Sequence, residues 1–212
     1  MSQSTAMQER MESVSRKILI TARNELYMKM RFLDVALSCM PFIPDTGADG
    51  MGTDGLYLYY DPQYLGGLFR EDRVMVNRIY LHLVLHGIFR HMLRRKGREE
   101  RIYHLACDIV AESIIDGLQY RCVMKGRSLP RREMYRMLKK KMKTLTAERV
   151  YEVLKKEEFP ETKLGQLESD FRVDDHSYWP KDEDKKKQSQ IENQWQDISE
   201  RMETEMETFS KE

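Results

Sequence analysis

The chain has 212 residues, of which 41% are hydrophobic and 33% are charged, with 15 methionines and a formal net charge of +1. This composition favours a soluble, mostly helical protein with one core, and its charge excludes a protein drawn as a whole onto nucleic acid or an acidic membrane. No secretory pattern opens the sequence and no apolar run approaches the length of a membrane span, so we expect a cytoplasmic protein. The three cysteines lack C-x-x-C spacing and are expected to be reduced, buried thiols.

The first part of the chain predicts a helix, a loop and a short strand. Residues 1–13 are polar and are expected to be disordered. Residues 14–40 place apolar side chains at helical spacing. Residues 41–55 hold four Gly and two Pro and are expected to form a loop. Residues 56–60, LYLYY, predict a strand that ends before a proline.

Residues 73–95 predict a core helix that carries two histidines four positions apart. His82 and His86 project from one face of that helix, one turn apart, so both imidazoles can share a metal ion. In the motif H-E-x-x-H, the glutamate after the first histidine takes a proton from metal-bound water. Leu83 stands at that position here. The alternative is a pair of hydrogen-bonded core histidines without a metal.

Residues 99–118 predict a second buried helix, with an acidic residue on its apolar face. Asp108 is the candidate third ligand, because a buried carboxylate needs a partner and two His with one Asp leave a coordination position open for water. Glu112, one turn later, is a candidate substitute base. It can equally pair with an arginine such as Arg78.

The rest of the chain alternates charged and amphipathic segments. Residues 121–143 hold ten Lys/Arg against one acid, which we interpret as a solvated basic face, with a phosphate or nucleic-acid site and a docking surface for an acidic protein as alternatives. Residues 146–156 predict a short capped helix, and residues 171–180 an irregular aromatic segment. Residues 181–188 predict a charged linker, and residues 191–209 a helix whose apolar stripe needs a partner surface.

Three further histidines lie outside the predicted set of metal ligands. His91, five residues after His86, and His104 are expected to be surface or capping residues. Asp175 and His176, with Asp174, could form hydrogen bonds that fix the tautomer of a metal ligand, although a surface turn is the alternative.

Four ordered segments of the sequence resemble one family. They are HLVLHGIFRHMLRRKGR, IYHLACDIVAE, TDGLYLYYDPQYL and VDDHSYW. Together they resemble a bacterial metallopeptidase-like family in which a von Willebrand factor A-like domain follows a zincin-like one. The resemblance implies a zincin-like α+β fold, mostly helical with a small sheet, over residues 14–180. Residues 181–212 would then be a charged linker and a C-terminal amphipathic helix.

The resemblance also implies site residues and partners. Zinc would be held by His82, His86 and Asp108, and Leu83 departs from the family's glutamate. The strand at Tyr57, Leu58 and Tyr59 would border the cleft and offer backbone groups to an extended substrate. A MoxR-type ATPase is the partner that the family suggests.

We therefore predict a zinc-binding, metallopeptidase-like domain whose peptide hydrolysis is impaired or lost and which binds a protein or peptide partner. General acid–base catalysis contributes about 10² to 10⁴ fold, and leucine cannot relay a proton. One alternative is an active zinc peptidase that uses Glu112 or Asp175 as its base. Another is a metal-free interaction scaffold.

Overall fold

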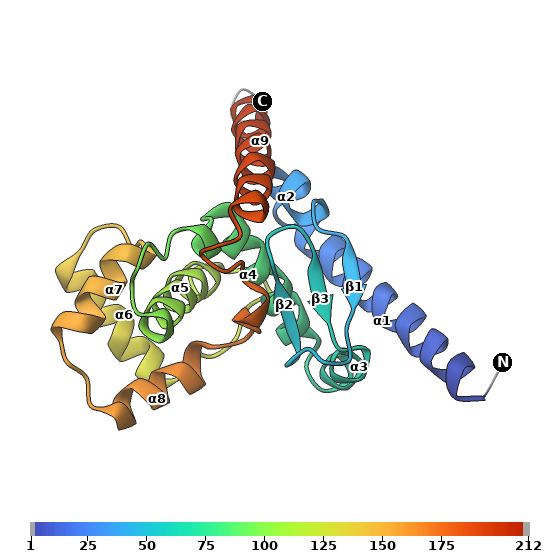
Figure 1. The fold of residues 1–212 in the computed structure, drawn as a ribbon, viewed down its shortest axis with the longest axis horizontal. Helices are drawn as coiled ribbons and strands as arrows, with labels where there is room; N and C mark the ends of the chain where they lie inside the picture. The colour runs from blue at the N-terminus through green and yellow to red at the C-terminus, as the bar shows by residue number, and fades with distance from the viewer. Residues whose placement is uncertain (1–2, 210–212) are drawn as a thin grey trace. The chain divides into compact units, whose positions relative to one another are not determined.

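Two groups of elements form separate units in the computed structural model, which describes residues 3–209 (Figure 1). The first unit comprises the chain up to Leu93 together with the chain from Asp174 onward, and the second runs from Arg94 to Val173. The predicted domain of residues 14–180 therefore contains all of the second unit and part of the first. Both units are mostly helical, and a small sheet in the first unit confirms the predicted α+β class.

The first unit begins with a long helix, α1 (Gln3–Tyr27). Residues 3–13, expected to be disordered, are thus helical, and Ser15 ties this part of α1 to Pro62 by donating its hydroxyl to the Pro62 carbonyl at 3.1 Å. The predicted helix of residues 14–40 divides into α1, η1 (Arg31–Leu33) and α2 (Asp34–Ser38). The apolar residues of the predicted stripe stay buried across these breaks, including Met30, Leu33, Ala36 and Leu37.

The sheet has three short strands, β1 (Phe42–Pro44), β2 (Met51–Thr53) and β3 (Leu58–Tyr60). The predicted strand is β3, and it lies in the centre, parallel to β1 and antiparallel to β2. The other two strands fall in the predicted loop. Strands of three residues are too short to show an alternating pattern. Gly52 occurs in β2 because the backbone of another segment approaches it closely, so this glycine does not mark a turn.

Two helices follow the sheet, α3 (Pro62–Glu71) and α4 (Arg73–Ile88). Asp61 caps α3 by accepting from the Gln63 amide at 2.7 Å, and Asp72 caps α4 by accepting from Met75 at 3.0 Å. Residues 76–87 of α4 are all buried, so this helix is the centre of the first unit. It ends earlier than predicted, at Ile88, and η2 (His91–Leu93) follows.

The end of α4 depends on an unusual backbone conformation at Arg90, with φ of 52°. This left-handed conformation is uncommon for a residue other than glycine. The Arg90 side chain contacts the last long helix, with Nη2 donating to Gln196 Oε1 at 2.9 Å and Nε lying 3.3 Å from Glu192 Oε1. These contacts stabilise the reversal of the chain after α4.

The first unit is completed by η3 (His176–Tyr178) and α9 (Lys185–Phe209). Ile191, Trp195 and Ile198 of α9 are buried, so the first half of its predicted apolar stripe has a partner surface. The Trp195 indole N–H donates to the Gly55 carbonyl at 2.8 Å. The indole also lies against Gly87 of α4, where a Cβ would come 1.9 Å from Trp195 Cζ2. Glycine is required there for close packing of α9.

The second unit consists of α5 (Glu100–Ile115), α6 (Leu129–Lys141), α7 (Ala147–Lys156) and α8 (Glu161–Phe171). One apolar cluster holds these helices together, from Ile102 on α5 to Phe171 at the end of α8. Nine of the ten basic residues between 121 and 143 are exposed, in agreement with a solvated basic face. The tenth, Arg131, points inward.

The cysteines agree only in part with the expectation of buried, reduced thiols. The three cysteines are free thiols; Cys107 is buried, whereas Cys39 and Cys122 are partly exposed. Within residues 3–209, none of the helices combines the length and the apolar character needed to cross a bilayer.

Candidate metal centre

The centre begins with the two histidines of α4. His82 and His86 are fully buried and face each other, with their Nε2 atoms 2.7 Å apart and their rings edge to face. This is the arrangement predicted from their spacing of four residues, because positions i and i+4 lie on one face of a helix. Both imidazoles therefore present the same nitrogen to one point.

A carboxylate just before η3 and a third imidazole at the first residue of η3 also reach that point. Asp174 Oδ1 lies 3.4 Å from His82 Nε2 and 3.1 Å from His176 Nε2, and its Oδ2 lies 3.8 Å from His86 Nε2. The Asp174 side chain is fully buried. Three imidazole nitrogens thus surround one buried carboxylate.

Asp175 holds this segment against the sheet and has no place among the converging groups. Its amide donates to the Met51 carbonyl at 2.7 Å, and its carboxylate accepts from the amides of Asp49 at 3.1 Å and Ser177 at 2.9 Å. A Cβ on Gly52 would lie 2.5 Å from the Asp175 carbonyl oxygen, so glycine is needed in β2 for this approach. Through these bonds Asp175 positions its neighbours Asp174 and His176, and its predicted role in fixing the tautomer of a metal ligand stays a prediction.

The charge of Asp174 is set by two opposed effects. Burial by itself would raise the pKa of this carboxyl, but attraction to the nearby His176 and His82 rings holds the pKa below its ordinary value. The carboxylate is therefore stabilised in its ionised form. An ionised carboxylate among imidazole nitrogens is a set of groups that also suits a divalent cation.

His91 extends the cluster by one residue. It was expected at the surface or at a helix end, but it is buried, and its Nδ1 lies 2.8 Å from Nδ1 of His86. The turn at Arg90 brings the chain back toward α4 and places His91 beside His86, which an uninterrupted helix could not do. The expectation was wrong because the helix was assumed to continue to residue 95. No local pattern in the sequence signals the turn.

Trp179 covers the third histidine. Its indole is stacked on the His176 imidazole, with centroids 4.0 Å apart, and lies edge-on to His86 at 5.2 Å. The VDDHSYW segment, weighed as a source of supporting hydrogen bonds, thus contributes an imidazole, a carboxylate and an aromatic cover to the centre itself.

These groups fit a metal ion. One ligand atom from each of His82, His86, Asp174 and His176 lies within 4.8 Å of the others. Two donors on one tetrahedral zinc, each bound at about 2.0–2.1 Å, stand roughly 3.3 Å apart. The distances from Asp174 to the imidazoles are close to that value, and the two histidines of α4 need to separate by only about half an ångström.

A match to a known protein family supports the interpretation of this cluster as a metal site. Residues 15–209 match the family model described as "Putative metallopeptidase domain". The chain belongs to this family. No curated protein and no solved structure gives a significant match to it.

In this member of the metallopeptidase-domain family, Leu83 is fully buried on α4 between the two histidines. An aliphatic side chain there packs in the core and has no acid–base chemistry. The turn of helix that carries the two imidazoles therefore supplies no proton acceptor at this position.

Glu112, the predicted substitute base, has a partner within the second unit. Its Oε2 lies 2.5 Å from Nη1 of Arg131, which also lies 3.2 Å from Asp116 Oδ2. The same guanidinium donates from Nε to the Asp170 carbonyl at 2.8 Å and lies over the Phe171 ring. Glu112 thus pairs with an arginine, as the alternative interpretation held, and the arginine is Arg131 in place of Arg78.

Asp108 and the substrate strand are the remaining site residues predicted from the sequence. Asp108 is buried on α5 of the second unit, and its role as a ligand stays a prediction. Of the predicted substrate strand, β3 contains Leu58 and Tyr59, Tyr57 precedes it, and β3 lies between β1 and β2. Its role in binding a substrate stays a prediction.

Proposed function

We propose that the chain is a zinc-binding, metallopeptidase-like domain of zincin-like fold, with impaired or lost peptide hydrolysis and a role in binding a peptide or protein partner. The observation that carries this proposal is the convergence of three imidazole Nε2 atoms on the buried carboxylate of Asp174. Membership of the metallopeptidase-domain family supports it.

The choice of zinc rests on the donor set. Imidazole nitrogen with one carboxylate oxygen is typical of zinc, whereas calcium and magnesium prefer oxygen ligands alone. His82, His86, His176 and Asp174 would hold the ion. Asp108, the ligand predicted from the sequence, is proposed as a further candidate.

When bound, zinc lowers the pKa of a coordinated water and acts as a Lewis acid. The chain's own residues prepare the site for it. His91 orients the His86 ring, Asp175 holds Asp174 and His176 in place through β2, and Trp179 shields the His176 ring from water. These contacts are the kind that fix ligand geometry in metal sites.

The loss of hydrolysis rests on the position of Leu83 and the engagement of Glu112. Leucine cannot accept a proton, and the Glu112 carboxylate is held by Arg131. A site without a general base loses about 10² to 10⁴ fold in rate. Such a domain keeps a binding function. The family resemblance suggests a MoxR-type ATPase as its partner.

Metal analysis of the purified full chain tests the proposal. We expect one zinc per chain, lost in His86→Ala and in Asp174→Ala, and kept in the control His104→Ala, which alters a half-buried histidine of the second unit. Asp108→Asn, measured in the same way, tests the ligand predicted from the sequence. A chain that binds no zinc would support the metal-free scaffold instead.

A peptide-cleavage assay on the zinc-loaded chain separates the remaining alternatives. We expect background activity, and a rise of at least about 10² fold in Leu83→Glu. Cleavage by the unaltered chain that disappears in Glu112→Gln would instead establish an active peptidase with a substitute base.

A further inference from the structure

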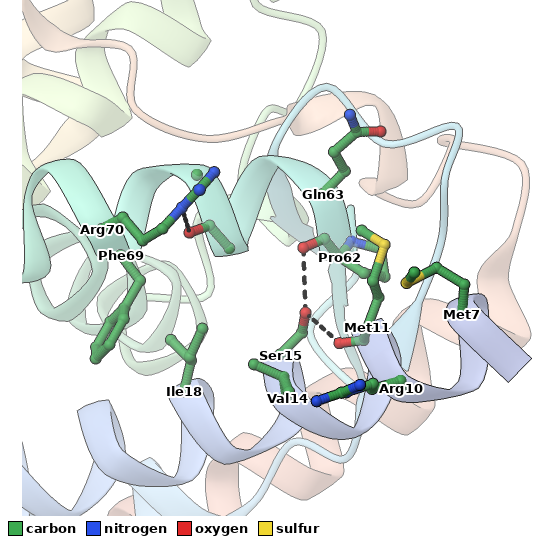
Figure 2. A pocket seen from close by; sticks show the side chains of 12 residues that line it. Met7, Arg10, Met11, Val14, Ser15, Ile18, Pro62, Gln63, Phe69 and Arg70 are labelled. Atoms are coloured by element: carbon green, nitrogen blue, oxygen red, sulfur yellow. Dashed lines mark hydrogen bonds between the residues drawn. The ribbon is translucent and has the colours of Figure 1, made fainter.

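An apolar groove lies between the first half of α1 and α3, and no residue of the histidine cluster lines it (Figure 2). Its volume is about 540 Å³. The α1 wall includes four apolar side chains, those of Met7, Met11, Val14 and Ile18, and the α3 wall includes two adjacent glycines, Gly66 and Gly67.

The α1 wall has the spacing of a helix–helix seam. Residues 7, 11, 14 and 18 follow intervals of four, three and four, as the a and d positions of a coiled coil do. Met7 and Val14 are 61% and 50% exposed, although both are large apolar residues. A Cβ added at Gly66 or Gly67 would meet no atom within 4 Å, so the opposite wall is open at these two positions. The groove therefore has room for another helix.

Two arginines determine the charge of the occupant. Arg10 lies on the α1 wall and Arg70 on the α3 wall, where its Nε donates to the Gly66 carbonyl at 3.3 Å (Figure 2). Both charged side chains that line the groove are thus cationic. A helix that fits carries an apolar strip flanked by acidic residues.

This chain possesses such a helix at the end of α9. The apolar stripe of α9 that contains the buried Trp195 and Ile198 continues to Met202 and Met206. The Met206 residue is 53% exposed. By helical geometry, Glu203 and Glu205 flank these methionines on opposite sides. An exposed apolar strip between glutamates is the complement of an apolar groove between arginines.

The end of α9 cannot reach the groove of its own chain. α9 is one uninterrupted helix, and Trp195 is anchored by its bond to Gly55. Residues 199–207 extend straight from that anchor, because a continuous helix does not fold back on itself.

We propose that two copies of this chain form a dimer in which the acidic end of each α9 docks in the α1–α3 groove of the other copy. The two copies are related by a twofold axis in this dimer, so both α9 ends and both grooves are occupied. The two contacts form together, which makes the pair stronger than either contact alone.

Light scattering coupled to size-exclusion chromatography of the full chain tests this dimer. We expect a mass that rises with concentration toward twice 25.3 kDa. Arg10→Glu with Arg70→Glu, and separately Glu203→Arg with Glu205→Arg, should each give monomers through like-charge repulsion. An equimolar mixture of these two variants should recover the dimer, since both of its contacts are again between opposite charges.

A steric variant gives an independent test. Gly67→Leu fills the groove from a helical position with open space around it, and should give a monomer of unchanged helicity. Gly165→Leu on α8 is the matched control, because its Cβ also meets nothing within 4 Å, and it should remain dimeric. Met206→Lys, at an exposed position, should act like Gly67→Leu without disturbing the fold.

Two outcomes would overturn the proposal. One is an unaltered chain that is monomeric at every concentration, which would leave the groove to another ligand. The other is a dimer that persists in Gly67→Leu, in Met206→Lys and in both charge variants, which would place the interface elsewhere on the molecule.

Discussion

The imidazole of His91 faces that of His86, and their Nδ1 atoms lie 2.8 Å apart. One of the two nitrogens must donate a proton and the other accept it. If His86 donates, its Nε2 keeps the lone pair that faces the cluster, which is the state required of a metal ligand. A buried histidine that is not itself among the converging groups is thus placed to bias the tautomer of His86.

His91→Ala should weaken zinc binding without abolishing it. Removing the partner of a ligating histidine costs about 10 to 100 fold in metal affinity. The measurement is competition with a chromogenic chelator. His91→Asn, which can still accept from Nδ1–H of His86, should recover part of the loss. Equal losses in both variants would indicate a packing role for His91, with no influence on the tautomer.

Gly87→Ala should destabilise the fold, against the usual effect of alanine in a helix. Alanine is favoured over glycine by about 1 kcal/mol in a helix interior. At residue 87 the new Cβ would lie 1.9 Å from the Trp195 indole, and overpacking of this kind costs about 1–3 kcal/mol or more. Urea unfolding followed by circular dichroism measures the difference. Gly66→Ala, a helical glycine with open space around it, should be neutral or stabilising.

Arg131→Leu should lower the free energy of unfolding by about 3–5 kcal/mol, because it leaves the buried carboxylate of Glu112 without its cation. The double variant Arg131→Leu with Glu112→Leu should lose less than the sum of the two single changes. Chemical denaturation gives these values. Arg132→Leu, at an exposed position of the same helix, should change stability by no more than about 0.5 kcal/mol. A small effect of Arg131→Leu would mean that Glu112 is protonated or otherwise compensated.

The contact between Tyr178 and Asp45 should appear in the acid titration of the first unit. The Tyr178 hydroxyl donates to Asp45 Oδ2 at 2.6 Å, and this bond, with that from the Gly47 amide, lowers the pKa of Asp45 below its ordinary 3.8. A carboxyl with a lowered pKa in the folded state adds stability above its unfolded pKa. That stability is lost as the pH falls through the folded value.

Tyr178→Phe should therefore raise the pKa of Asp45 toward 3.8 and remove the stabilisation that is present above that pH. Carboxyl NMR as a function of pH measures the change. Tyr57→Phe is the control: its side chain is 40% exposed, and it should leave Asp45 unchanged. An Asp45 titration unaffected by Tyr178→Phe would assign the low pKa to the Gly47 amide alone.

The sequence determined the local features of this protein. The spacing of four residues placed His82 and His86 on one helical face, alternation marked the strand at β3, and the apolar stripe of residues 191–198 predicted a buried helix face. Each of these follows from the period of a helix or strand, which is a property of neighbouring residues. Strands β1 and β2 and the helical start of α1 were missed because a segment rich in Gly and Pro, or a polar segment, carries too little of that period.

Only the tertiary structure decided which distant groups meet. Asp174 and His176 join His82 and His86 although about 90 residues separate the two segments, because Asp175 pairs with Met51 and Gly52 of the sheet. Arg131 takes Glu112 although 19 positions lie between them. His91 turns back to His86 because contacts with α9 stabilise a left-handed Arg90. These pairings depend on how side chains of separate elements pack, and no periodic pattern along the chain encodes them.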